Sequence, residues 1–245
     1  MQSNKKLVKN SSNTYYMYGK HAIFAAIKND NRQVSNIYCL KKTFLEFKNK
    51  VHNFHAEIVS SIFIEGKIGT GQPHQGIIAL VHSIFLDNID NLSYAKGIDR
   101  IVILDQVTDP QNIGAIVRSA TAFGFTKLIL LKDYAPEENA VIAKVASGSL
   151  ELIEVAKVTN LKTTIEILKK KGFWISGLDL NGKDSLSSLT KFDKIVVVIG
   201  SEGKGMRYLT KKCCDFLIRI SISNEVQSLN ASSAASIIFH SVNQR

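Results

Sequence analysis

Residues 194–207 read KIVVVIGSEGKGMR, and this stretch decides the fold. Its five consecutive aliphatic residues, 195–199, are typical of a strand that is buried on both faces in a parallel sheet. The strand runs into a loop with three glycines and one acid, Glu202. Because ligands of open α/β sheets bind at the carboxyl ends of the strands, we interpret this loop as a candidate binding loop.

The glycine spacing of the same loop excludes two common nucleotide sites. Gly200, Gly203 and Gly205 do not follow the G-x-G-x-x-G pattern of dinucleotide-binding enzymes, which argues against an oxidoreductase of that class. Lys204 is followed by glycine, whereas a P-loop requires Ser or Thr at that position. The loop therefore has to be interpreted together with the rest of the chain.

Composition narrows the class of protein. The 245 residues are 45% hydrophobic and 21% charged, which is ordinary for a globular protein with a real core. No apolar run approaches the roughly 20 residues that cross a bilayer, and the N-terminus lacks the apolar segment of a secretory signal. Three cysteines, at 39, 213 and 214, are too few for a disulfide framework or a complete zinc site. We expect a cytoplasmic protein with no membrane contact and no metal.

The charge of the chain favours a nucleic-acid partner. Lys and Arg number 31 against 21 Asp and Glu, which gives a formal net charge of +10. Such an excess is the footprint expected of a protein that binds a phosphate backbone. A lysine-rich composition spread along the chain is the alternative explanation. RNA is the partner that we expect.

The order of hydrophobic segments indicates two domains. Residues 1–16 are rich in Asn, Ser and Lys, and we expect a disordered tail there. Residues 17–83 form a small α/β domain, residues 84–98 a linker, and residues 99–245 a larger α/β domain. In the first domain we predict strands at 37–40, 57–60 and 74–81, with helices at 19–29 and 44–54.

The larger domain alternates strands and helices, which predicts a mostly parallel sheet covered on both faces. The predicted strands are 101–104, 128–131, 152–155, 173–177, 195–199 and 216–220. The predicted helices run from Pro110 to Gly124, and over 140–144, 161–171, 206–211 and 229–240.

Polar side chains follow three of these strands, and each has an unremarkable structural explanation. Asn112 could be a helix N-cap, and Ser228 could be another, with Asn230 a polar residue of that helix's first turn. Arg118 could be a surface residue whose stem covers apolar groups. Glu202 could pair with Lys204 or Arg207.

Taken together, three segments resemble the signature motifs of the SpoU/TrmH family of RNA ribose 2′-O-methyltransferases, within the SPOUT class. They are residues 109–120 (DPQNIGAIVRSA), residues 200–206 (GSEGKGM), and residues 218–232, from IRI to SLNAS. Their order is that of the family. Residues 18–23 (YGKHAI) and 74–77 (HQGI) are similar to the accessory RNA-binding domain of bacterial large-subunit rRNA guanosine 2′-O-methyltransferases.

The resemblance implies more than the patterns do. It implies a SPOUT domain with a C-terminal trefoil knot over the segments from about Ile195 to the final helix, which is a rare exception to the un-knotted rule. It implies S-adenosyl-L-methionine as the cofactor and a homodimer with the active site near the subunit interface. It implies RNA, specifically large-subunit rRNA, as the substrate.

The resemblance also assigns roles to single residues. Gly200, Ile220 and Leu229 would contact the cofactor. Arg118 would be catalytic, and we expect it to orient the ribose or phosphate, because a guanidinium pKa above about 12 makes a literal base role costly. The polar residues that would organise the site are Asn112, Glu202, Ser228 and Asn230.

The third motif departs from the family pattern of Ile-Pro-Met followed by a glycine. Ser221 and Ile222 follow Ile220, Asn224 stands at the glycine position, and Ala231 replaces a common β-branched residue. A looser cofactor loop is the expected consequence, although Asn tolerates the left-handed backbone region. We therefore consider an active rRNA enzyme, a tRNA 2′-O-methyltransferase, and a non-catalytic RNA-binding member of the fold.

Overall fold

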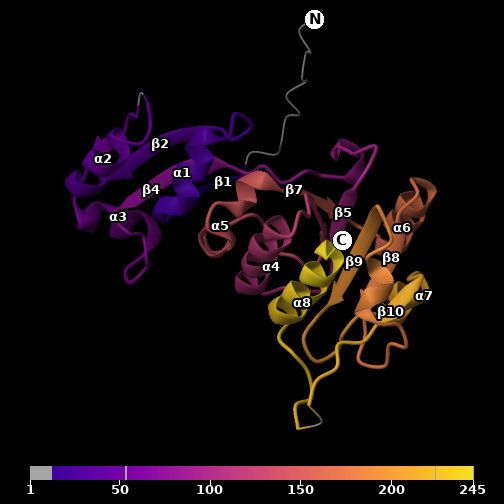
Figure 1. Ribbon diagram of the computed structural model, residues 1–245. Helices are drawn as coiled ribbons and strands as arrows, with labels where there is room; N and C mark the ends of the chain where they lie inside the picture. The colour runs from indigo at the N-terminus through magenta and orange to yellow at the C-terminus, as the bar shows by residue number, and fades with distance from the viewer. Residues whose placement is uncertain (1–12, 53, 224, 245) are drawn as a thin grey trace, which may run out of the picture.

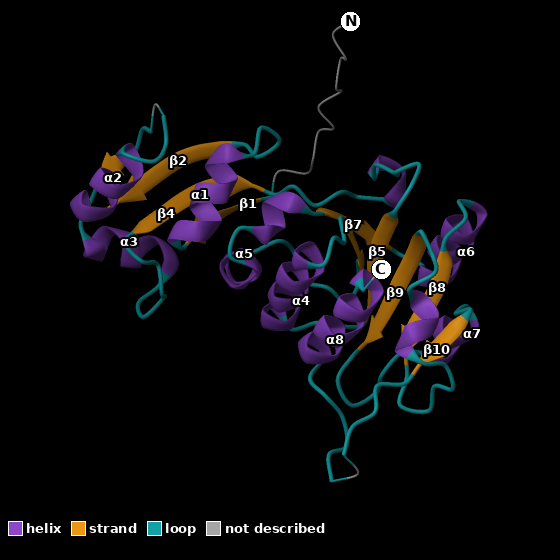
Figure 2. Ribbon diagram, viewed as in Figure 1, coloured by secondary structure: helices purple, strands orange, loops and turns teal. Residues whose placement is uncertain are grey.

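Two β-sheets organise the protein (Figure 1). The computed structural model describes residues 13–52, 54–223 and 225–244. A four-stranded sheet has the order β1-β4-β2-β3, and a six-stranded sheet has the order β10-β8-β9-β5-β6-β7. Figure 2 shows helices packed against both sheets. The strand and helix alternation predicted from the sequence is confirmed for the larger sheet.

The N-terminal sheet begins earlier than we predicted. Its elements are β1 (Thr14–Tyr18), α1 (Lys20–Lys28), β2 (Val34–Cys39), α2 (Lys41–Lys48), β3 (Glu57–Ile58), α3 (Ser61–Ile68) and β4 (Ile77–His82). The expected tail is wrong for residues 14–16, because β1 pairs antiparallel with β4 along its whole length and buries Met17 and Tyr18. Residues 1–12 of that tail lie outside the described residues. Helix α3 was not predicted.

The C-terminal sheet is parallel in all five strand pairs. Its elements are β5 (Asp99–Asp105), α4 (Pro110–Ala122), β6 (Lys127–Leu131), α5 (Ala140–Ala146), β7 (Glu154–Val158), α6 (Leu161–Lys170), β8 (Trp174–Leu178), β9 (Lys194–Gly200), α7 (Tyr208–Lys212), β10 (Phe216–Ile218) and α8 (Ala231–Asn243). Short 3₁₀ turns occupy Ser149–Leu152 and Leu186–Leu189. The first of these turns takes residues 149–152, so the strand predicted at 152–155 begins only at Glu154.

The two central strands of this sheet are apolar on both faces, as residues 195–199 predicted. Val197 and Ile199 of β9 share a core with helices α4 and α8, whereas Val196 and Val198 share a second core with α6. Helices therefore cover both faces, and the carboxyl ends of β5 and β9 meet at one edge. The trefoil knot stays a prediction.

Loop segments pair with both outer strands of the C-terminal sheet. Leu86, in the segment that joins the two sheets, donates its N–H to the carbonyl of Val155 and accepts from the N–H of Lys157, both at 2.8 Å. A 3₁₀ turn at Ile89–Asn91 follows. At the opposite side of the sheet, Asp184 pairs with Ile218 of β10 through a parallel bridge.

A buried polar cluster joins the N-terminal sheet to the C-terminal one. The carboxylate of Glu138 accepts from Tyr15 Oη at 2.8 Å, Arg32 Nη1 at 2.5 Å, Ser83 Oγ at 2.8 Å and the N–H of Ile84 at 2.7 Å. Arg32 also pairs with Glu151 at 2.7 Å. Burial raises the pKa of Tyr15 well above its ordinary value. The carboxylates of Glu138 and Glu151, from the C-terminal domain, thus bind residues of the N-terminal domain and of the segment that joins the two sheets.

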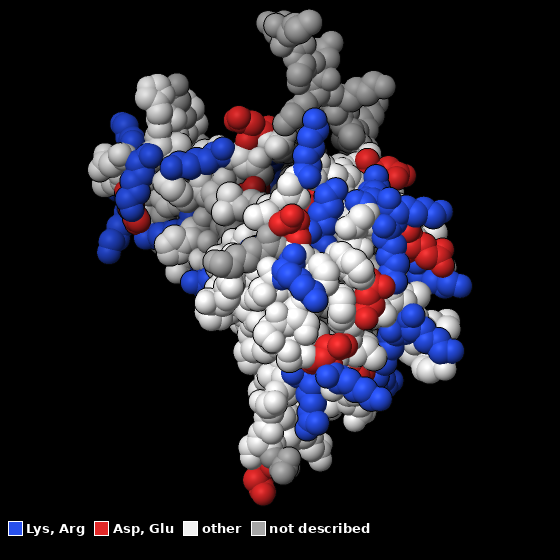
Figure 3. Space-filling view, turned by 45° about the vertical axis from the view of Figure 1, so that its right-hand side comes forward, with Lys and Arg blue, Asp and Glu red and all other residues white. Residues whose placement is uncertain are grey.

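Within the described residues, no helix has both the length and the apolar character that a membrane crossing requires. Lys and Arg side chains are numerous over the face shown in Figure 3, with Asp and Glu interspersed.

Candidate active site

Three segments that follow strands meet at the carboxyl edge of the C-terminal sheet. Helix α4 begins after β5, and Asp109 caps it by accepting from the N–H of Gln111 at 3.0 Å. Helix α8 begins after the last long loop, and Asn230 caps it by accepting from the N–H of Ser232 at 2.9 Å. Neither Asn112 nor Ser228 is therefore a helix cap. The loop after β9 lies between the two helix starts.

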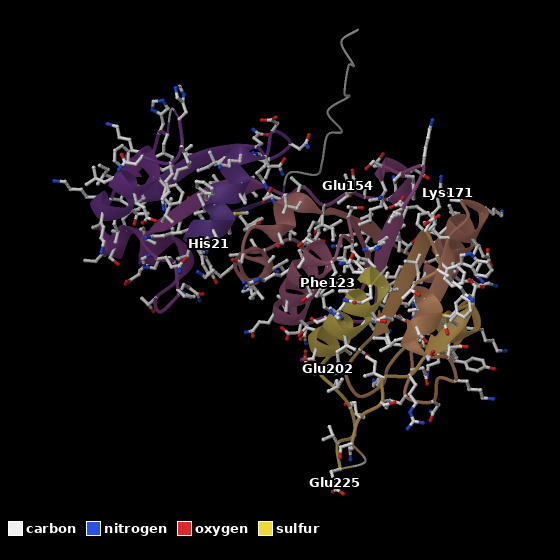
Figure 4. All side chains as sticks on the ribbon, in the orientation of Figure 1. His21, Phe123, Glu154, Lys171, Glu202 and Glu225 are labelled. Atoms are coloured by element: carbon white, nitrogen blue, oxygen red, sulfur yellow. The ribbon has the colours of Figure 1, made fainter. Side chains whose placement is uncertain are left out.

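Asn112, Glu202 and Asn230 form one hydrogen-bonded group, which we call the Asn–Glu–Asn cluster. Glu202 Oε1 accepts from Asn112 Nδ2 at 3.0 Å and from Asn230 Nδ2 at 2.5 Å. The same oxygen lies 3.4 Å from the N–H of Ala231, at the start of α8, where the helix dipole favours an anion. Glu202 pairs with neither Lys204 nor Arg207. Figure 4 shows Glu202 beside α8, at the lower end of the C-terminal sheet.

The loop that carries Glu202 is folded back on itself. Gly203 and Gly205 have φ angles of 77° and 65°, the left-handed region that favours glycine. Gly205 donates its N–H to the carbonyl of Ser201 at 2.9 Å. A Cβ atom on Gly200 would lie 2.2 Å from Gly205 C and Met206 N, so only glycine fits there. The close approach is between two parts of the same loop, and the predicted contact of Gly200 with the cofactor stays a prediction.

A pocket of about 270 Å³ opens beside the cluster. The predicted cofactor residues Gly200, Ile220 and Leu229 all line it, and so do Glu202 and Ser228. The remaining lining residues come from the end of β8 and the turn after it, the end of β9 and the loop after it, α7, β10 and the segment after it, and the start of α8: Leu178, Asp179, Leu180, Asn181, Ile199, Ser201, Gly203, Lys204, Gly205, Lys211, Ile218, Ile222, Ala231 and Ala234.

Sequence reasoning missed the contribution of β8. Asp179 follows that strand and pairs with Lys211 at 2.5 Å, while accepting from the N–H of Asn181 at 2.8 Å. Burial alone would raise the pKa of Asp179, but the Lys211 ammonium and the Asn181 N–H hold that pKa below its ordinary value. The signal that could have found Asp179 is its place directly after a strand that is parallel to β9.

Arg118 stands apart from the cluster. It lies on α4 six residues after Asn112, which is roughly 9 Å along the helix axis. Its side chain is exposed, does not line the pocket, and makes no hydrogen bond or ion pair with the described residues. The structure therefore brings together Asn112, Glu202 and Asn230 and leaves Arg118 open to a ligand.

The unusual residues of the third motif have different surroundings. Ile222 is partly buried and lines the pocket, so it supplies an apolar wall. Ser221 is exposed and does not line it. Ala231 lines the pocket at the first position of α8. Asn224 lies outside the described residues.

The comparisons with known proteins identify the family. The model of the SpoU rRNA methylase family matches residues 99–240, which include every segment that lines the pocket. The chain belongs to this family.

Similar proteins extend over almost the whole chain. A tRNA/rRNA methyltransferase of Synechocystis is 35% identical over 92% of this chain, which spans 61% of that relative's length. The 23S rRNA (guanosine-2′-O-)-methyltransferase RlmB of Pseudomonas aeruginosa is 32% identical, with 94% of this chain and 96% of the relative covered. Among solved structures, the SpoU methyltransferase AviRb from Streptomyces viridochromogenes, in complex with AdoMet, superposes with a TM-score of 0.81 at 21% identity. That match covers 97% of this chain and 94% of AviRb. This last likeness concerns the fold.

Proposed function

We propose that this protein transfers a methyl group from S-adenosyl-L-methionine to a ribose 2′-hydroxyl of RNA, with a guanosine of large-subunit rRNA as the substrate. The observation that carries the proposal is the Asn–Glu–Asn cluster beside the pocket. Its three residues come from three separate motifs, up to 118 positions apart, and hydrogen bonds join them. Relatives named as RlmB, at 32% and 34% identity, support the choice of rRNA and of the 2′-hydroxyl.

The pocket residues fit S-adenosyl-L-methionine. Ile220, Ile222 and Leu229 offer the apolar walls that a purine ring requires. Two acids, Asp179 and Glu202, and two lysines, Lys204 and Lys211, also line the pocket, so both signs of charge are available to a ligand that carries amino and carboxylate groups. Gly200 allows the loop backbone to fold back closely enough to form the wall of the pocket.

The chain's own residues would position the RNA substrate and stabilise the charge that develops on its 2′-oxygen. When bound, S-adenosyl-L-methionine would supply the methyl group to an oxygen that approaches in line, and its sulfur would leave with the electron pair of the broken C–S bond. Arg118 holds the ribose or its phosphate and stabilises negative charge on the 2′-oxygen as the hydroxyl proton leaves to solvent. The Asn–Glu–Asn cluster fixes the loops on which this geometry depends.

Comparing cells with and without the gene tests two alternatives, namely a tRNA substrate and a non-catalytic RNA-binding protein. The Synechocystis relative is named for both tRNA and rRNA, so tRNA is the second candidate substrate. Ribose methylations are mapped in total rRNA and tRNA from cells with and without the gene. We expect one guanosine of large-subunit rRNA to lose its methyl group in the deletion strain. Loss at a tRNA position would move the substrate to tRNA, and no lost position would favour a non-catalytic RNA-binding protein.

The catalytic role of Arg118 has its own experiment. Arg118→Ala should bind S-adenosyl-L-methionine in a calorimetric titration with nearly wild-type affinity, because Arg118 does not line the pocket. It should lose methyl transfer to rRNA. Lys162→Ala, which removes an exposed cation from α6, is the matched control. Near wild-type transfer by Arg118→Ala would remove Arg118 from the mechanism.

We also propose a homodimer, a cytoplasmic location, and RNA binding by the N-terminal domain, which begins at β1 and comprises residues 14–83. The net charge of +10 supports binding to a phosphate backbone. Helix α8, whose N-terminal end carries the site, presents Ile237 with 39% of its surface exposed, which suits a subunit contact. Light scattering coupled to size exclusion measures the mass, and a monomer at micromolar concentration would contradict the dimer.

A further inference from the structure

A fully buried acid lies at the carboxyl end of β5. Asp105 is 0% exposed, and both of its carboxylate oxygens are engaged by one residue of the loop after β9. Oδ2 accepts from the backbone N–H of Arg207 at 3.0 Å, and Oδ1 accepts from Arg207 Nε at 2.7 Å. Because charge-assisted bonds of this kind are strong and a buried carboxylate needs partners, the contact fixes the position of Arg207.

The same acid is also next to the other end of the loop. In the β5–β9 pairing, Asp105 is the register partner of Gly200, the last residue of β9. The chain leaves the sheet at Gly200, folds back through residues 201–206, and returns at Arg207. Asp105 therefore meets the loop at its start through strand pairing and at its end through its side chain.

This loop, between Gly200 and Arg207, forms a wall of the pocket. Residues 199–205 line the pocket, and Glu202 at the tip of the loop joins the Asn–Glu–Asn cluster. Met206, just before Arg207, is 3% exposed and packs against Gly177 of β8. Burial of Met206 fixes how deeply the end of the loop sits in the core. The Asp105–Arg207 pair fixes the distance between the two ends of the loop, at Gly200 and Arg207.

We propose that Asp105 is a positioning residue for the cofactor and acts through Arg207. The pair holds the loop in its folded-back form, so that the pocket exists before the ligand arrives. Loss of the pair lowers the fraction of molecules with a competent pocket, and the apparent dissociation constant rises by the inverse of that fraction. This role rests on the proposed function, since the ligand is S-adenosyl-L-methionine.

The experiment titrates S-adenosyl-L-methionine, without RNA, into the full chain by calorimetry. Arg207→Ala keeps the backbone N–H but removes the guanidinium from a side chain that is 39% exposed, so the fold should persist. We expect the dissociation constant to rise about tenfold, the effect of losing one charge-assisted hydrogen bond. Arg207→Lys should recover part of the loss, and Lys212→Ala, an exposed cation of the following helix, should match the wild type.

A second variant separates positioning from stability. Asp105→Asn keeps the size of the buried side chain and should weaken cofactor binding as Arg207→Ala does. The double variant should be no weaker than Asp105→Asn alone, because both changes break one pair. In steady-state transfer to rRNA, KM for the cofactor should rise while kcat at saturating cofactor stays within about threefold.

The outcomes distinguish this role from the proposed function. If Asp105→Asn and Arg207→Ala lower the unfolding temperature but bind the cofactor as the wild type does, the pair is only structural and the inference is overturned. If both weaken cofactor binding while the wild type methylates no RNA, the inference stands and the proposed substrate fails. A wild type that binds no S-adenosyl-L-methionine overturns both.

Discussion

The side-chain amide of Asn230 donates to the side-chain carbonyl of Asn112 at 2.9 Å, across 118 positions of sequence. Each residue also donates to Glu202, so these three side chains tie the start of α8 to the first turn of α4. Asn230 is at the same time the N-cap of α8. One residue thus serves both helix stability and the site, and substitution can separate the two roles.

Asn230→Ser should preserve the helix cap, because Ser accepts from the same backbone N–H groups. It loses the donors to Asn112 and Glu202. We expect methyl transfer to fall at least about tenfold, as for the loss of a hydrogen bond to a charged group, while the unfolding temperature changes little. Asn160→Ser, the equivalent change at the cap of α6, is the control and should leave transfer unchanged. Equal loss in both variants would mean that only helix capping matters.

Gly200→Ala should abolish cofactor binding without unfolding the protein. The added Cβ would lie 2.2 Å from two backbone atoms of the same loop, so the loop must open. Gly66→Ala is the control, since a Cβ there meets nothing within 4 Å in the interior of α3, and it should stabilise the protein by up to about 1 kcal/mol. Calorimetric titration and thermal unfolding measure the two effects. Wild-type affinity in Gly200→Ala would contradict the close approach.

Glu138→Ala should destabilise the folded chain by about 3–5 kcal/mol, because it leaves the buried Arg32 without one of its two carboxylates. Glu166→Ala, which breaks a surface pair between side chains that are 56% (Glu166) and 63% (Lys162) exposed, should cost less than about 1 kcal/mol. Urea unfolding measures both. Similar small losses in the two variants would show that the polar cluster between the sheets contributes little to stability.

Two thiols should react slowly with iodoacetamide. Burial raises the pKa of Cys39 to about 11 and that of Cys214 to about 12. At pH 8 we expect at least about a hundredfold less thiolate than in an unfolded chain, and a correspondingly slower reaction. Because the folded-state pKa is raised, the stability contributed by the neutral thiols is complete below pH 9 and is lost as the pH rises toward these values. Mass spectrometry of timed alkylation, with urea-unfolded protein as the reference, checks the rates.

The sequence predicted the C-terminal sheet well because three of its inner strands, β9, β5 and β6, contain runs of aliphatic residues. The strand at Thr14–Tyr18 was missed because its polar and aromatic residues follow an Asn- and Ser-rich stretch, and its burial depends on pairing with a strand some 60 positions away. Helix α3 contains a glycine and lacks a periodic apolar face, so local pattern could not indicate it.

Some residues of the candidate site were likewise predicted from the sequence, and others were found only in the fold. Gly200, Glu202 and Asn230 were found because they lie in the segments that resemble the family's motifs. Asp179 belongs to none of those motifs, and the pairing of Asp105 with Arg207 follows from β5 and β9 being neighbours, which spacing along the chain does not show. Contacts that depend on strand order could be recovered only from the fold.

The segments that pair with the outer strands have a consequence for behaviour at high concentration. An open outer strand presents unpaired N–H and carbonyl groups, and other chains can add to it and begin aggregation. Here Leu86 occupies such groups beside β7, and Asp184 does so beside β10. A change that frees either segment, such as Leu86→Pro, would give the sheet a template for intermolecular strand addition. The segment that joins the two sheets and the loop before β9 thus block the addition of strands from other chains at these two edges.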